Sequence, residues 1–186
     1  MKQVLTHDRE ALKSRIWALD LDPIVVKLTH ADGGTGWTRE RALQGAEEYR
    51  RFLFLTVARP ETIVPTEFID EVWHTHILDT MKYAEDCDRA FGFFLHHFPY
   101  FGIRGDDDQA LLQSTFRATA GIYESEFGST YFVGLDSAGD CSGGGGCAHT
   151  APYAAGDCSG GGGCAHPGYI VEDVVRSNLR PSLAAA

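Results

Sequence analysis

The side chains best suited to chemistry lie in a segment that occurs twice. The segment from Gly139 to His149, with the sequence GDCSGGGGCAH, is repeated without change from Gly156 to His166. Zinc prefers thiolate and imidazole ligands, and the glycines between the cysteines allow the backbone to curl around a small centre. The repeat therefore predicts a zinc site made from some or all of six side chains: Cys141, Cys147, His149, Cys158, Cys164 and His166.

The spacing within the repeat leaves other interpretations open. Structural zinc sites usually separate their cysteines by about two to four residues, and Cys141 and Cys147 lie further apart than this. The repeat is also compatible with a flexible tail made by tandem duplication, or with a redox disulfide. A further interpretation is a Cys/Ser/Gly tract that serves as the substrate of a peptide-modifying enzyme.

Four more histidines form a possible second metal site: His74 and His76 in IDEVWHTHILDTMKYAEDC, and His96 and His97 in HHFPYFG. Residues two apart on an α-helix point to nearly opposite sides, so His74 and His76 cannot share a metal on an unbroken helix. His74 shares its face with Asp70, four residues earlier. The four histidines are open to three interpretations, namely a polar network, a metal site and a catalytic site.

His76 lies on an apolar stripe of the predicted helix, which favours a hydrogen-bonded core residue. The function that we expect is a non-enzymatic zinc-binding module for a protein partner. The alternative is a metalloenzyme or redox protein that uses His74, His76, His96 or His97 beside the cysteine loops. The sequence alone leaves the choice between enzyme and binding module open, although it favours the binding module.

Helical periodicity predicts the elements that position these residues. Apolar side chains recur at helical spacing over residues 5–20, 38–58, 66–91 and 106–127. We therefore expect an all-α fold, a bundle of about four helices followed by an irregular Gly/Cys-rich C-terminal lobe. The expected domains are residues 1–128 for the helical part and 129–186 for the lobe.

Composition and charge narrow the classes of partner. The chain has 186 residues and a net charge of -10, which disfavours binding to a phosphate backbone. No apolar run has the length of a signal peptide or a membrane span, so we expect a cytoplasmic protein that binds neither nucleic acid nor membrane. In the cytoplasm the five cysteines would be reduced, which favours metal binding over structural disulfides.

Two motifs resemble the glycine-rich domain-containing protein-like family: WHxHxLxxxxYxxDC, from Trp73 to Cys87, and FGFFLHHFPYFG, from Phe91 to Gly102. The chain departs from the family pattern at Thr80, where plant members commonly have proline. The resemblance covers most of residues 5–127 and is most specific over 69–102. It implies a helical region followed by a glycine-rich segment, in a bacterial member of the family. It implies no established catalytic activity.

Overall fold

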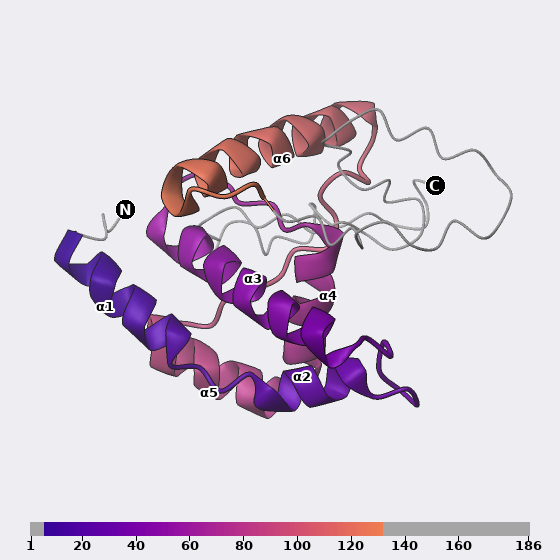
Figure 1. Ribbon diagram of the computed structural model, residues 1–186. Helices are drawn as coiled ribbons and strands as arrows, with labels where there is room; N and C mark the ends of the chain where they lie inside the picture. Colours follow the sequence, from indigo (N-terminus) through magenta and orange to yellow (C-terminus); the bar gives the residue numbers. More distant parts are fainter. Residues whose placement is uncertain (1–5, 132–186) are drawn as a thin grey trace, which may run out of the picture.

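The computed structural model describes residues 6–131, which form six α-helices and no β-strand (Figure 1). The all-α prediction is therefore confirmed for this part of the chain. The repeated cysteine segment, with its six predicted metal ligands, lies outside the described residues. The helices are α1 (Thr6–Trp17), α2 (Asp22–Thr29), α3 (Arg39–Ala58), α4 (Glu67–Leu78), α5 (Thr80–Phe91) and α6 (Asp106–Phe127).

Helix α2 was not expected, because the apolar periodicity predicted helices only over residues 5–20 and 38–58 in this part of the chain. Proline at the first position of a helix is favourable, because its fixed φ suits the helix and its missing N–H would have no partner there. Pro23 is the second residue of α2, within the first turn, where an N–H would also lack a partner inside the helix. Ile24, Val25 and Leu28 bury the inner face of this short helix. Asp22 and Pro23 therefore begin a second helix, whereas α1 already ends at Trp17.

The single helix expected over residues 66–91 is wrong, because the structure divides it into α4 and α5 at Asp79. The backbone of Asp79 is non-helical, with φ -84° and ψ 74°. Its carboxylate accepts a hydrogen bond from the N–H of Lys82 at 3.3 Å, and this bond caps the start of α5. The chain turns at this point, so residues of α5 pack beside residues of α4 instead of continuing away from them.

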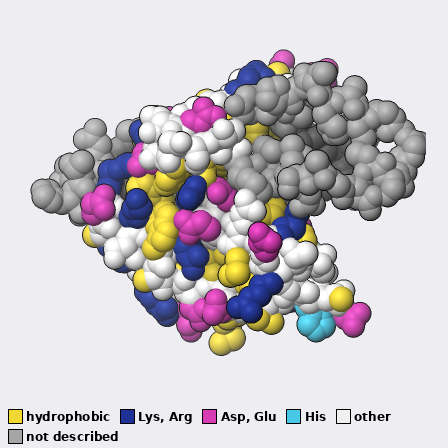
Figure 2. Space-filling view, in the orientation of Figure 1, with side chains coloured by type: hydrophobic (Ala, Val, Ile, Leu, Met, Phe, Trp, Pro, Cys, Tyr) yellow, Lys and Arg dark blue, Asp and Glu magenta, His cyan; other side chains and the backbone are white. Residues whose placement is uncertain are grey.

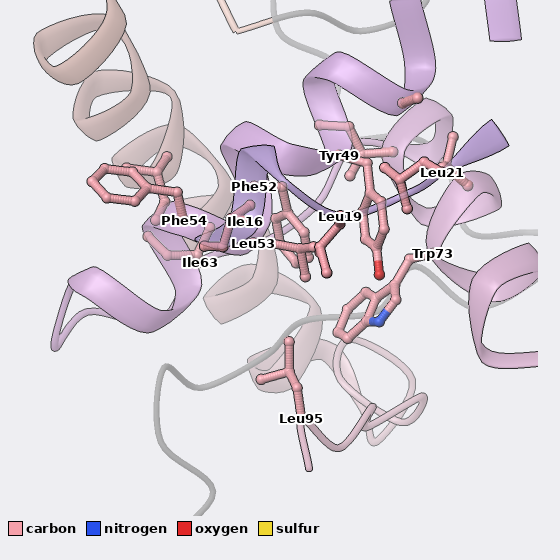
Figure 3. Packing of buried hydrophobic residues seen from close by; sticks show 14 of the residues in the cluster. Ile16, Leu19, Leu21, Tyr49, Phe52, Leu53, Phe54, Ile63, Trp73 and Leu95 are labelled. Carbon is pink, nitrogen blue, oxygen red and sulfur yellow. The ribbon is translucent and has the colours of Figure 1, made fainter. Parts of the chain in front are cut away.

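Helix α3 lies at the centre of the bundle and packs against α1, α2 and α4. Helix α6 lies on the other side of α3 from α2 and α5 (Figure 1). It is tied to the rest of the fold by Tyr123, which donates a hydrogen bond to Glu48 of α3, and by Thr119, which accepts one from the N–H of Val64. The core is aromatic as well as aliphatic, and includes Tyr49, Phe52 and Trp73 (Figure 3).

The surface shown in Figure 2 carries basic and acidic side chains that are interspersed rather than gathered by sign. None of the helices in residues 6–131 is long and apolar enough to cross a membrane.

Candidate metal centre

Two potential metal ligands lie one helical turn apart on α4. Thr66 caps this helix by accepting a hydrogen bond from the N–H of Ile69, which fixes where the first turn begins. Residues four apart on an α-helix lie on the same face, so Asp70 and His74 point in the same direction. Asp70 Oδ2 lies 3.6 Å from His74 Nε2. Asp70 is buried, whereas the side chain of His74 is 43% exposed.

The third potential ligand, His97, comes from the irregular segment that follows α5. Gly92 ends α5 in the left-handed conformation, with φ 76°, which a residue with a side chain rarely adopts. The chain then returns to α4. There the Nε2 atom of His97 lies 3.1 Å from Nε2 of His74 and 3.4 Å from Oδ1 of Asp70.

The closest contacts among the three side chains are similar in length to the distances between ligand atoms around a single metal ion. Ligand atoms about 2.0–2.1 Å from a tetrahedral zinc ion lie roughly 3.3–3.4 Å from one another. The two Nε2 atoms are 3.1 Å apart, whereas the carboxylate of Asp70 offers one oxygen to each histidine, Oδ1 at 3.4 Å from His97 and Oδ2 at 3.6 Å from His74. Two imidazole Nε2 atoms that face each other also share at most one proton, whereas a cation accepts a lone pair from both of them and from the carboxylate. Asp70, His74 and His97 can therefore hold a metal ion.

The structure brings together only two of the four histidines that the sequence grouped. His74 and His97 meet, whereas His76 faces the other way on α4 and is 1% exposed. His96 is exposed, and its ring packs against Phe94. A single site made from all four histidines does not form.

His76 belongs to a buried hydrogen-bond network. Its Nδ1 lies 3.1 Å from the hydroxyl of Tyr49, and its Nε2 lies 3.1 Å from Oδ2 of Asp86. Because Asp86 is an acceptor, Nε2 carries the proton, and Nδ1 then accepts from Tyr49. Burial lowers the pKa of His76 to about 4, although the charge of Asp86 opposes this shift. Lys82 also contacts Asp86, at 2.9 Å. The sequence-based preference for a core histidine at this position agrees with these contacts.

Asp70 is the potential ligand that sequence reasoning did not select. Its spacing of four residues from His74 was visible in the sequence, and this is the spacing by which helices present paired metal ligands. What the sequence did not show was the partner, because His97 lies 23 residues after His74 and reaches it only through the turn between α4 and α5 and the end of α5 at Gly92.

Comparison with known proteins identifies relatives of the helical region. A family model described as UCP032817-like matches residues 28–121. Glycine-rich domain-containing proteins 1 and 2 of Arabidopsis thaliana are each 30% identical to the chain over 94 residues, or 48% of its length. The match spans only 11% and 12% of these two relatives. No solved structure matches the chain.

The matched region contains α3, α4 and α5 together with Asp70, His74 and His97. It covers half of the chain, and the relatives found by sequence are the glycine-rich domain-containing proteins that the two motifs resemble. The chain therefore belongs to the UCP032817-like family.

Proposed function

We propose that this chain is a non-enzymatic zinc-binding module that engages a protein partner. The observation that carries the proposal is the convergence of Asp70, His74 and His97, whose potential ligand atoms lie within 4.8 Å of one another and whose closest contacts are 3.1, 3.4 and 3.6 Å. Two of the ligands come from a capped helix, and the third is partly buried, with a side chain that is 11% exposed. A metal ion at this position would join α4 to the segment that follows α5.

The ligand types favour zinc over the hard cations. Calcium takes six to eight oxygen ligands and magnesium takes six, mostly oxygens of water, so neither prefers a site with two imidazoles. Imidazole suits zinc, copper, iron and nickel, and zinc accepts two imidazoles and one carboxylate in four-coordinate sites. The repeated cysteine segment, which supplies thiolates by its sequence, also has the ligands of a zinc protein.

The surface beside the metal centre supports a protein partner. Leu78 lies on α4 four residues after His74, and its side chain is 80% exposed. Met81, at the start of α5, is 77% exposed. Large apolar side chains at protein surfaces contribute to interfaces when they cluster, and these two lie on either side of Asp79, at the turn between α4 and α5.

The first prediction concerns the effect of zinc on stability. The test uses the full chain in which the four tail cysteines are replaced by serine, here called the serine variant, so that zinc bound by thiolates does not contribute. Zinc at about one hundred times its dissociation constant adds roughly 2.7 kcal/mol to the free energy of unfolding, which raises the melting temperature by about 5–10 °C. The measurement is thermal unfolding with zinc and with EDTA. The four replacements are Cys141→Ser, Cys147→Ser, Cys158→Ser and Cys164→Ser.

Adjacent histidines provide a matched control for this measurement. His97→Ala in the serine variant removes a ligand and should abolish the rise in melting temperature. His96→Ala removes an exposed imidazole that packs against Phe94, and should leave the rise unchanged. The proposal fails if zinc does not stabilise the serine variant, or if the two alanine variants respond to zinc alike.

One observation favours a zinc enzyme as the second candidate. Two imidazoles and one carboxylate also form the ligand set of hydrolytic zinc sites, in which a water molecule completes the coordination. A zinc-dependent hydrolysis of an ester or phosphate ester by the serine variant, lost in His97→Ala and retained in His96→Ala, would establish this alternative over the non-enzymatic module.

A further inference from the structure

The ligands of the metal centre differ in how firmly the fold holds them. Asp70 and His74 belong to a regular helix with a side-chain cap. His97 belongs to a segment without regular structure, which begins at Gly92. Metal affinity depends on whether all the ligands are in place before the ion arrives, so the side chains that hold the His97 segment are as important as the ligands themselves.

A buried tyrosine holds this segment. The hydroxyl of Tyr83, on α5, donates a hydrogen bond to the backbone carbonyl of Leu95, two residues before His97. The same hydroxyl accepts a hydrogen bond from Nε1 of Trp73, on α4, at 3.0 Å. Tyr83 and Trp73 are both almost completely buried, at 1% and 0% exposed. Water therefore does not compete for these hydrogen bonds, and each has a well-defined geometry.

Trp73 also contacts the ligand directly. Its ring lies edge-on to the imidazole of His97, with centroids 4.7 Å apart and planes at 67°. Trp73 precedes His74 in the sequence, so the indole fixes His97 from the same helix that supplies the other two ligands. One hydroxyl thus connects α4, α5 and the segment that carries His97.

We propose that Tyr83 is a positioning residue of the metal centre: through Leu95 and Trp73 it places His97 opposite Asp70 and His74, and so sets the affinity for zinc. This inference rests on the proposed zinc function. Burial raises the pKa of the Tyr83 hydroxyl, so this group remains protonated and able to donate at physiological pH.

The experiment measures the zinc dissociation constants of two proteins, each made by replacing one tyrosine of the serine variant with phenylalanine. Tyr83→Phe keeps the ring and removes the hydroxyl that holds Leu95. Tyr123→Phe is the matched control, because it removes a buried hydroxyl that hydrogen-bonds to Glu48 and Arg51 instead. Competition with a chromophoric zinc chelator, at a temperature where both proteins are folded, should give an affinity about tenfold weaker for Tyr83→Phe and unchanged for Tyr123→Phe.

A second comparison separates positioning from a general loss of stability. If Tyr83 acts through His97, Tyr83→Phe should not weaken further the residual zinc binding by Asp70 and His74 in the His97→Ala background, titrated at zinc concentrations far above those of the melting experiment. The inference would be overturned if Tyr83→Phe reduced the zinc affinity equally with and without His97. It would also be overturned if Tyr83→Phe and Tyr123→Phe reduced the zinc affinity equally.

Two further outcomes are distinguishable. Zinc binding by the serine variant that Tyr83→Phe leaves unchanged would overturn the inference and leave the zinc function intact, whereas absence of zinc binding would overturn the zinc function itself. If Tyr83→Phe does not fold, Trp73→Phe removes the other end of the hydrogen-bond chain, and the same tenfold loss is expected from it.

Discussion

Two histidines separated by one residue have different roles because they lie on opposite faces of α4. His74 faces His97 and the carboxylate of Asp70, and its side chain is 43% exposed. His76 faces the core and is enclosed by Tyr49 of α3 and Asp86 of α5. Exposure allows His74 to meet a metal ion from solution, whereas burial makes His76 a neutral member of the hydrogen-bond network.

The residue-scale prediction is a loss of stability in acid that depends on His76. The pKa of His76 is about 4 in the folded protein, against 6.5 in the unfolded chain. Below pH 6.5 the unfolded state therefore binds a proton that the folded state does not. The stability is therefore unaffected above pH 6.5 and falls as the pH decreases towards 4, by on the order of 3 kcal/mol over this range.

Urea unfolding of the protein in the presence of EDTA, between pH 7.5 and 4.5, measures how the free energy of unfolding depends on pH. His76→Gln retains groups that can accept from Tyr49 and donate to Asp86, but it does not titrate in this range. The variant should be less stable than the parent at pH 7.5 and should lose less stability on acidification. Identical losses in the two proteins would show that other groups account for the acid dependence.

At the scale of elements, the turn at Asp79 makes the contacts between α4 and α5 possible. Because α5 packs beside α4, residues ten apart in the sequence meet: Trp73 contacts Tyr83, and His76 contacts Asp86. On one continuous helix, ten residues correspond to roughly 15 Å, too far for any of these contacts. The capping carboxylate of Asp79 favours the divided arrangement locally.

We predict that Asp79→Ala destabilises the protein by about 1 kcal/mol, because the N–H of Lys82 loses its cap. Asp88→Ala provides the control, since it removes the same charge from an exposed position within α5 and should change stability by less than about 0.5 kcal/mol. Thermal unfolding measures both. Alanine favours helix, so a single helix through this region would instead be stabilised by Asp79→Ala, and that result would contradict the two-helix arrangement.

At the scale of the whole molecule, the chain carries two sets of potential metal ligands that differ in chemistry. The helical region has two imidazoles and one carboxylate in one place. The repeated segment has four cysteines and two histidines within residues 139–166. Zinc sites need about four ligands, so the two sets are together sufficient for more than one ion.

We predict that the full chain binds about two zinc ions, one in each set. Elemental analysis of protein purified without chelators should give about one zinc ion in the serine variant, and about one in the chain carrying both His74→Ala and His97→Ala. A single ion that is lost in both variants would indicate one site that the two sets share. Retention of both ions in the serine variant would show that the repeated cysteines are not ligands.

The helix boundaries depend on residues close together in the sequence, and most of them were predictable. Thr38 and Thr66 cap α3 and α4, and Gly128 ends α6 in the left-handed conformation. A cap needs only a side chain within about three residues of the backbone group that it binds. The division at Asp79 also depends on a local cap, but it was not predicted because the apolar stripe continues through both helices.

The candidate metal centre, in contrast, was decided by tertiary structure. The helical periodicity placed Asp70 and His74 on one face, but it contained no information about which distant side chain would face them. His97 was chosen over His96 by the path of the chain after Gly92 and by the contacts of Leu95 and Trp73 with Tyr83. These contacts join residues 10 and 12 positions apart, and they form only once α4 and α5 have packed against each other. Local patterns specify a helix, whereas the meeting of three ligand atoms requires the packed core.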